Sequence, residues 1–555
     1  GSEMCIRDRT EAAIQAISAG LDVEASSECF PHLIAMVKEK KIDEKLIDKA
    51  VSRVLLAKFR MGLFEDPYGE KYEAQSLHSR ENIRVARQIA DESTVLLKND
   101  KGLLPLNLSE LNSIAVIGPN ADQVQFGDYT WSRTNKDGVT PLEGIRKLTE
   151  PFGIQIRYAQ GCSMMSLDTI HIASAVEAAR QSDVAILFCG SSSASLARDY
   201  NETNCGEGFD LADLALTGAQ GKLIKAIHAT GKPVILVLVT GKPFSIAWEK
   251  KHIPAILIQW YAGEQEGSSI ANILFGKTNP SGHLTVSFPQ SSGHLPAYYN
   301  YLPTDRGFYH KPGNYEQPGR DYVFSSPGPL WAFGHGLTYT TFNYTDMQIQ
   351  QSVDSIKVFV TVKNTGRWAG KAVPQLYVRD VFSSISTPVK QLKAFNKVTL
   401  EPGETTRVPL HFAVQDLALT DEAGKTMVEP GSFEIMIGDA SDHILLKQTI
   451  SIGQNMAVSP CSIKEQLPEE IGKGNIIHIK GVVRDVQATP VDKVEIYSTA
   501  QQQVIGVTDQ NGKYFIDAPE DDVLVFCKSG YLDEKVNVDR KNDIQITIRS
   551  KMVFP

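Results

Sequence analysis

The 555 residues of the chain are enough for about three or four domains of ordinary size, each with a hydrophobic core. Hydrophobic residues make up 42% and charged residues 22%, as in globular proteins, and no apolar run approaches the ~20 residues that a membrane helix requires. The formal net charge of -9, without a cluster of lysine and arginine, disfavours nucleic acid as a partner and is compatible with a neutral substrate.

The seven cysteines are scattered along the chain, and no two of them form a CxxC pair. Neither a zinc site nor a disulfide framework is therefore indicated, and we expect no metal and no cofactor. Residues 1–9 resemble a tag followed by adapter sequence rather than natural protein, and no signal peptide begins the chain. The natural beginning is expected to be missing.

Residues 10–78 are predicted to be mostly helical. A short helix spans Glu11 to Gly20, and a second begins at Asp43, a plausible N-cap. Fewer than ~70 residues of helix cannot bury an apolar face by themselves, so this segment is predicted to be the end of a larger domain. The face in question follows Asp43 with helical spacing, at Leu46, Ile47, Ala50, Val51, Val54 and Leu55.

Residues 79–290 alternate between helices and strands, which predicts an α/β/α sandwich around a mostly parallel sheet. Three apolar runs, at 184–188, 234–239 and 255–258, are unbroken, as in strands buried on both faces of such a sheet. A helix is predicted from Ser79 to Leu97. The other predicted strands are 114–117, 154–158 and 284–286, and the other predicted helices are 141–149, 170–181, 214–229 and 266–275.

A polar, glycine-containing insertion between Gly190 and Asp213 follows the strand at 184–188 and is longer than a βα connection needs. Long loops at the carboxyl ends of strands carry the sites of α/β folds. We therefore expect the chemistry of this chain, if it has any, in this insertion.

The rest of the chain is predicted to be all-β. Residues 291–338 are rich in proline, glycine and tyrosine and are predicted to be an ordered linker. Residues 339–453 change to an alternating pattern with turns at Asn364-Thr365-Gly366 and Glu401-Pro402-Gly403, which predicts a β-sandwich. A polar linker at 454–474 leads to a second, small β-sandwich at 475–551.

Four motifs stand out along the chain: Val95-Leu96-Leu97-Lys98-Asn99, Trp260-Tyr261-Ala262-Gly263-Glu264-Gln265-Glu266-Gly267, Asn279-Pro280-Ser281-Gly282-His283-Leu284 and Phe333-Gly334-His335-Gly336-Leu337-Thr338. Together they resemble glycoside hydrolase family 3, the β-glucosidase and β-xylosidase group. The α/β segment is similar to the family's C-terminal domain, and 339–453 looks like its fibronectin type III-like domain. The last sandwich is similar to carboxypeptidase regulatory-like domains.

The resemblance implies a retaining glycosidase, which needs a carboxylate nucleophile and a second carboxyl as acid and then base. It places the nucleophile, an aspartate, on a (β/α)8 barrel of which residues 10–78 would be the last part, so no nucleophile is expected in this chain. It makes Glu207, in Gly206-Glu207-Gly208-Phe209-Asp210, the candidate acid/base. Leu211 stands where the family usually has arginine, which removes an expected charge partner.

Without the resemblance, Glu207 would read as a solvated surface charge. Asp199, Asp210 and Trp260 are the candidates for substrate contact, although the two aspartates fit ordering of the loop better and Trp260 could equally be a packing residue. Three other glutamates have structural interpretations: Glu202 would order the loop, and Glu264 and Glu266 would stabilise the N-terminus of a helix.

The sequence thus predicts the C-terminal part of an exo-acting bacterial β-glycosidase that removes terminal β-glucosyl or β-xylosyl residues from oligosaccharides. The chain alone is expected to be inactive, with the missing barrel as its partner and a homodimer left open. A periplasmic or extracellular location is expected. The alternative is a non-catalytic carbohydrate-binding or scaffolding module of an envelope saccharide system, built from the two sandwiches.

Overall fold

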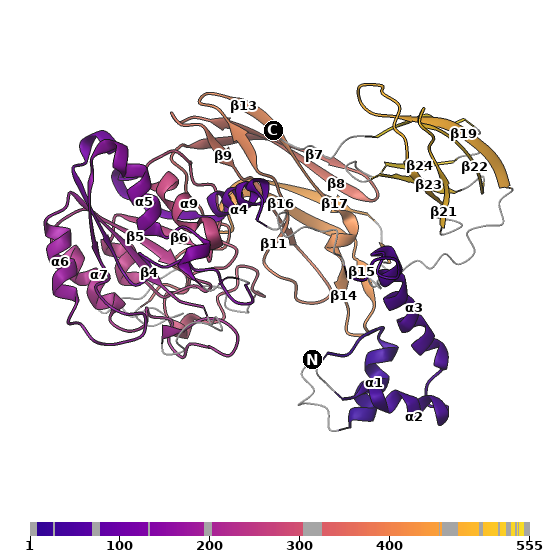
Figure 1. Ribbon diagram of the computed structural model, residues 1–555, viewed down its shortest axis with the longest axis horizontal. Helices are drawn as coiled ribbons and strands as arrows, with labels where there is room; N and C mark the ends of the chain where they lie inside the picture. Colours follow the sequence, from indigo (N-terminus) through magenta and orange to yellow (C-terminus); the bar gives the residue numbers. More distant parts are fainter. Residues whose placement is uncertain are drawn as a thin grey trace.

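The structure is a computed structural model of the chain (Figure 1). It describes residues 8–25, 28–68, 78–130, 132, 134–193, 202–303, 325–453, 456–457, 476–498, 503–519, 522–528, 534–538, 541 and 543–548. Four parts with separate hydrophobic cores follow one another: an N-terminal helical segment, an α/β domain and two β-sandwiches.

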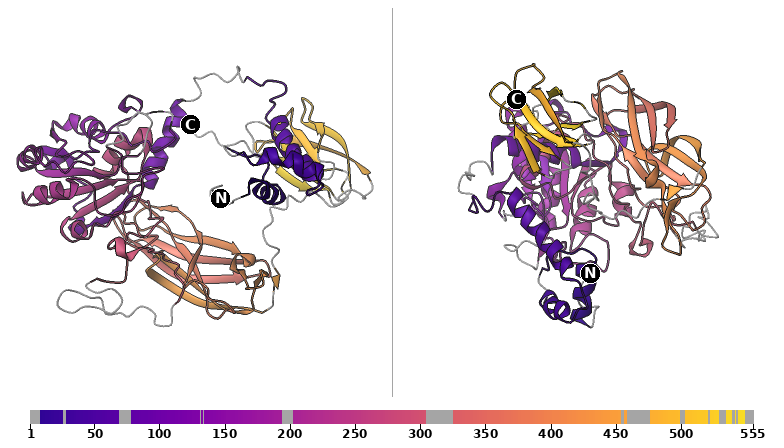
Figure 2. Two further views of the ribbon diagram at one scale, coloured as in Figure 1. Left: turned by 90° about the horizontal axis from the view of Figure 1, so that it is seen from below. Right: turned by 90° about the vertical axis from the view of Figure 1, so that its right-hand side faces the viewer.

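The N-terminal segment contains α1 (Arg9–Ser18), α2 (Leu33–Lys38) and α3 (Glu44–Arg60). The first and third helices are confirmed, with the Asp43 carboxylate accepting a hydrogen bond from the Lys45 amide at the start of α3. The predicted apolar face is only partly covered, since Val51 and Leu55 are 48% and 40% exposed, and Phe59, one turn beyond the predicted face, is 58% exposed. The three helices lie as a group apart from the α/β sheet (Figure 2).

The predicted helix from Ser79 to Leu97 is wrong in its last part. Helix α4 (Arg80–Ser93) is capped by Ser79 and ends before Thr94, and the following residues form strand β1 (Val95–Asn99). Val95, Leu96 and Leu97 are buried, since β1 is an end strand of the sheet that pairs antiparallel with residues 255–258 of the neighbouring strand. A fully buried apolar run satisfies its backbone in the sheet, and this tertiary pairing overrides the helical pattern that precedes it.

The α/β domain is built on one six-stranded sheet in the order β1-β6-β5-β4-β2-β3, parallel except for β1. This confirms the predicted mostly parallel α/β/α architecture. The remaining strands are β2 (Ser113–Ile117), β3 (Gln155–Ala159), β4 (Val184–Gly190), β5 (Val234–Val239) and β6 (Ala255–Gln259).

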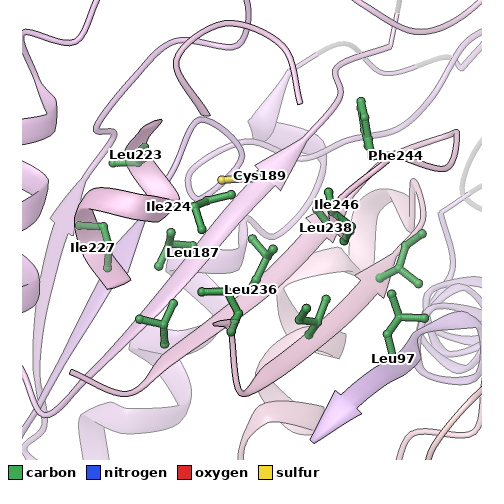
Figure 3. Close-up of a cluster of buried hydrophobic side chains, with 14 of the residues drawn as sticks. Leu97, Leu187, Cys189, Leu223, Ile224, Ile227, Leu236, Leu238, Phe244 and Ile246 are labelled. Carbon is green, nitrogen blue, oxygen red and sulfur yellow. The ribbon is translucent and has the colours of Figure 1, made fainter. Parts of the chain in front are cut away.

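Helices cover both faces of the sheet. One face packs against α6 (Ile172–Arg180), α7 (Gln220–His228) and α8 (Ala247–His252), and Figure 3 shows part of this core. The other face packs against α5 (Pro141–Thr149) and α9 (Glu266–Leu274). Because helices cover both faces of the sheet, the loops that follow the carboxyl ends of the parallel strands are the part of the domain where a site can form.

The domain differs from the prediction in three further places. Helix α7 begins at Gln220 rather than Leu214, and α8 was not predicted. Residues 284–286 are not a strand, because the Leu284 amide and carbonyl bond to His335 and Gly334 in an irregular turn instead of joining the sheet.

The first β-sandwich has two main sheets, β11-β10-β16-β17 and β13-β8-β7, which enclose a common core as predicted. Its main strands are β7 (Phe342–Gln351), β8 (Ser355–Asn364), β10 (Gln375–Asp380), β11 (Gln391–Phe395), β13 (Thr405–Ala413), β16 (Gly431–Ala440) and β17 (His443–Ile452). The short strands are β9 (Gly370–Ala372), β12 (Val398–Leu400), β14 (Leu419–Thr420), β15 (Thr426–Val428) and β18 (Met456–Ala457).

The second β-sandwich is also confirmed as two sheets around one core, β22-β19-β25 and β21-β20-β23-β24. Its strands are β19 (Ile476–Arg484), β20 (Glu495–Ser498), β21 (Gln503–Val507), β22 (Lys513–Pro519), β23 (Val523–Cys527), β24 (Glu534–Asn537) and β25 (Ile546–Thr547). Strand β24 was not predicted. In the part of the chain that the structure describes, no helix is both long and apolar enough to span a membrane.

The α/β domain and the first sandwich are joined by a charged contact centred on Glu92 of α4. Its carboxylate accepts hydrogen bonds from Lys371 at 2.5 Å and from Lys397 at 3.3 Å, both on the sandwich. Burial alone would raise the pKa of Glu92, but hydrogen bonds from Lys371 and Gln88 and the charges of the two lysines outweigh it and lower the pKa to about 2. The ionised carboxylate therefore stabilises the folded arrangement of the two domains.

Glu92→Gln is expected to lower the free energy of unfolding by about 1–3 kcal/mol near neutral pH. Because the folded-state pKa of about 2 lies below the ordinary value of 4.5, the stabilisation is fully present above pH 4.5 and is lost as the pH falls through 2. Urea unfolding at several pH values should show the difference between variant and parent shrinking over this window. Glu81→Gln on the same helix is the control, since its pair with Arg84 is exposed; an equal loss there would contradict a special role of Glu92.

Candidate active site at the carboxyl edge of the sheet

The insertion after β4 returns to the edge of the sheet where the strand ends. Ser193, just after β4, forms a parallel bridge with Cys205. One residue earlier, the Ser192 amide donates to the Asn204 side-chain oxygen at 2.9 Å, and Asn204 in turn donates to Thr217 at 2.7 Å. These contacts close the base of the insertion, so that the segment after Cys205 starts from a fixed point.

Glu207 lies in a tight turn directly after this fixed point, and it is exposed. The glycines on both sides have positive φ angles, 114° for Gly206 and 80° for Gly208, a backbone conformation that side chains disfavour. A Cβ on Gly206 would also lie 2.2 Å from a carboxylate oxygen of Asp128. Glycine at 206 thus allows the turn to sit against Asp128 and leaves the Glu207 carboxyl facing outwards.

Asp128 holds this turn in place. One carboxylate oxygen, Oδ2, accepts a hydrogen bond from the Glu207 amide at 2.9 Å, and the other, Oδ1, accepts one from the Ser193 hydroxyl. One half-buried side chain therefore ties the start of the insertion to the backbone of Glu207. Asp128 was not predicted from the sequence. It could have been considered, because β2 and β4 are parallel neighbours and the loops that follow them therefore lie close together.

The turn is supported on its other side by two further contacts. The Lys242 ammonium, after β5, donates to the Phe209 carbonyl at 3.0 Å, and Asp213 accepts a hydrogen bond from the Ser292 hydroxyl at 3.0 Å. Asp210, in the same segment as Glu207, is exposed. Tyr129, next to Asp128, is 88% exposed with a φ of 57°, and it was also missed.

A buried hydroxyl cluster forms the floor behind the turn. The Ser191 hydroxyl lies 2.6 Å from the Tyr261 hydroxyl and donates to Thr240 at 2.9 Å, so the carboxyl ends of β4, β5 and β6 are joined. Burial raises the pKa of Tyr261 far above its ordinary value, which keeps the phenol neutral. Cys205 is also buried here. Gly241 lies close to both the Cys205 sulfur and the Tyr261 ring, so the three residues pack together.

Trp260 does not face this cluster. Successive residues of an extended segment point to opposite sides. Tyr261 contacts the insertion, so Trp260 points the other way. Trp260 packs against the core on the α7 side of the sheet and lines a cavity beside the first sandwich. The structure thus separates Trp260 from Glu207. Asp199 lies outside the described residues.

The other acidic residues have structural contacts. Glu202 accepts a hydrogen bond from the Met164 amide at 2.7 Å, which confirms its interpretation as a residue that orders the loop. Glu266 is the first residue of α9, where its charge suits the helix dipole, and it accepts from the Gln125 amide at 2.7 Å. Glu264 lies 2.7 Å from the His78 ring. Among the described residues, no group of three His, Cys, Asp or Glu side chains could hold a metal ion.

The comparison with protein families decides what this edge belongs to. Residues 94–339 match the glycosyl hydrolase family 3 C-terminal domain. Residues 372–441 match the fibronectin type III-like domain, which confirms the second part of the resemblance. Glu207, Asp128 and Tyr261 all lie within the family 3 C-terminal domain. The second sandwich is matched by neither family, and its likeness to carboxypeptidase regulatory-like domains stays a prediction.

Similar proteins carry glycosidase names. The chain is 37% identical to a beta-xylosidase of Formosa agariphila, over 80% of this chain and 61% of that protein, and 36% identical to a periplasmic beta-glucosidase of Salmonella typhimurium, over 79% and 60%. A crystal structure of beta-glucosidase from Listeria innocua in complex with isofagomine matches with a TM-score of 0.71 and 32% identity, over 81% of this chain and 61% of that one. The chain thus spans about three fifths of the length of these relatives.

Proposed function

We propose that this chain is the C-terminal part of a retaining exo-β-glycosidase and that Glu207 is its acid/base. The observation that carries the proposal is the position of Glu207: an exposed carboxyl on a glycine-flanked turn, held by Asp128 at the open edge of a family 3 C-terminal domain. The xylosidase and glucosidase relatives support terminal β-xylosyl or β-glucosyl residues of oligosaccharides as the substrate.

In this mechanism the Glu207 carboxyl donates a proton to the glycosidic oxygen as the bond to the sugar breaks, and its carboxylate later removes a proton from the attacking water. A second carboxylate about 5–5.5 Å away must attack the sugar from the other face. We assign that nucleophile to a barrel domain outside this chain. The exposed apolar stripe of Val51, Leu55 and Phe59 on α3 supports a larger domain that packs there.

The residues around Glu207 suit sugar binding from one side. Tyr129 offers an exposed aromatic ring next to Asp128, and Asp210 offers a carboxylate that can accept hydroxyl hydrogen bonds. Asp199 remains a candidate on the same insertion. Trp260 is withdrawn as a contact of the reacting sugar, since it faces away from Tyr261 and the insertion. A periplasmic or extracellular location remains part of the proposal.

The chain alone is expected to release no p-nitrophenol from p-nitrophenyl β-glucoside or β-xyloside. Fusion to the part of the Formosa agariphila relative that precedes the matched region is expected to create activity, because it would supply the missing nucleophile. Both measurements use the same absorbance assay, with the fused segment alone as the control. Turnover by the chain alone that is lost on Glu207→Gln would refute the assignment of the nucleophile to another domain, and a folded but inert fusion would count against the whole proposal.

A further inference from the structure

A cavity lies at the junction of the α/β domain and the first sandwich. Its volume is about 380 Å³, in the range of small-molecule sites, and it sits between the end of β6 and strand β11. None of its lining residues belongs to the turn of Glu207 or to the loop of Asp128. It is therefore separate from the candidate active site.

One wall of the cavity is aromatic. Trp260 at the end of β6 and Phe333 line it from the α/β side, and Phe395 lines it from the end of β11. Phe395 is 66% exposed although it is a large apolar ring. Exposed aromatic rings gathered at a concave surface mark a site where another apolar face packs.

Other residues at the cavity supply hydrogen-bonding groups. The His283 Nδ1 lies 2.6 Å from the Gly334 carbonyl, so Nδ1 must carry the proton and the other ring nitrogen, Nε2, is an acceptor. Burial lowers the pKa of His283, which keeps the ring neutral. The Trp260 indole N–H is a donor that has no hydrogen bond to any described residue. The residues that line the cavity thus include a donor, the Trp260 indole, and an acceptor, His283 Nε2.

The charges at the cavity are already balanced. Lys397 donates to the Glu92 carboxylate and to the Ser281 hydroxyl at 3.3 Å each, and Glu92 is also held by Lys371 outside the cavity. A ligand therefore need not bring a charge. A neutral ring with an apolar C–H face and a rim of hydroxyls matches this combination of aromatic wall and polar groups.

We propose that this cavity binds a neutral pyranose unit of an oligosaccharide, stacked on Trp260 and Phe395, as a second saccharide site of the chain. The pyranose hydroxyls would accept from the Trp260 indole and donate to His283 Nε2. This site goes beyond the proposed hydrolysis, because it requires neither Glu207 nor a nucleophile. It would hold a chain of sugars on the protein while its end is processed elsewhere.

Isothermal titration of the whole chain with cellotetraose and xylotetraose tests the site directly. Binding of either sugar is expected, with the affinity reduced at least about tenfold by Trp260→Ala and by Phe395→Ala, while Trp260→Phe retains part of it. Trp368→Ala is the matched control, since that tryptophan is 37% exposed on the same sandwich but does not line the cavity. Phe395 is mostly exposed, so its variant keeps the fold and remains informative if Trp260→Ala unfolds.

Binding by neither sugar, or binding that both Trp260→Ala and Phe395→Ala leave unchanged, would overturn the proposal. Because the titration measures binding by the chain without its barrel, its result does not depend on whether Glu207 is the acid/base. A Trp260→Ala chain that loses sugar binding but, once fused to a barrel, still hydrolyses p-nitrophenyl glycosides would further separate this site from the active site.

Discussion

Glu207→Gln, in a fusion that carries the missing barrel, is expected to lower kcat/KM for alkyl β-glycosides by about 10²–10⁴-fold. Glutamine keeps the shape of the side chain but cannot donate or accept the proton that each half of the reaction moves. The loss should be smallest for leaving groups that need no protonation, such as 2,4-dinitrophenol. Initial rates with methyl, p-nitrophenyl and dinitrophenyl glycosides would give this dependence.

The matched control is Glu150→Gln in the same fusion. Glu150 is exposed and follows α5, whose carboxyl end lies at the other edge of the sheet, so no change in rate is expected. Equal losses for all three leaving groups would indicate that the substitution disturbs binding rather than proton transfer. Full activity of Glu207→Gln with alkyl glycosides would remove Glu207 from the mechanism.

Leu236→Ala is expected to destabilise the α/β domain by about 2–5 kcal/mol, because it leaves a cavity in a closely packed core. Leu236 lies on the central strand β5, is fully buried, and is surrounded by residues of α7 and the neighbouring strands (Figure 3). Urea unfolding followed by circular dichroism would measure the shift of the transition that belongs to this domain. The two sandwiches have separate cores and should unfold as before.

Leu167→Ala is the control for this loss. Leu167 is in the same domain but 72% exposed, so its truncation removes little buried surface. A similar shift for the two variants would mean that the core around β5 is not what stabilises the domain. An unchanged transition for Leu236→Ala would contradict the tight packing of the sheet against α7.

The architecture could be predicted because its strongest signals are local. The unbroken apolar runs of β4, β5 and β6 are short and bounded by turn residues, which favours buried strands, and the alternation after Ser355 favours strands with one buried face. The end of α4 could not be predicted in the same way. Residues 95–97 fit a helix as well as a strand, and the choice depends on pairing with β6, more than 150 residues away.

The site could be predicted only in part. Glu207 followed from the resemblance of its motif, but Asp128, which holds it, lies 79 residues earlier in the chain and has no motif of its own. The orientation of Trp260 depends on which side of an extended segment faces the insertion. That choice is made by the packing of Tyr261 against Ser191 and Cys205, which sequence spacing does not reveal.

The two hydrogen bonds of Asp128 have a consequence for anyone who exchanges loops between relatives. The segment around Asp128 and the turn of Glu207 follow different strands, yet the position of each depends on its hydrogen bonds with the other. If only the loop after β4 is taken from a relative, it lacks the aspartate segment that matches it and is expected to adopt another conformation. Transplantation should therefore succeed only when both segments are moved together as a single cassette.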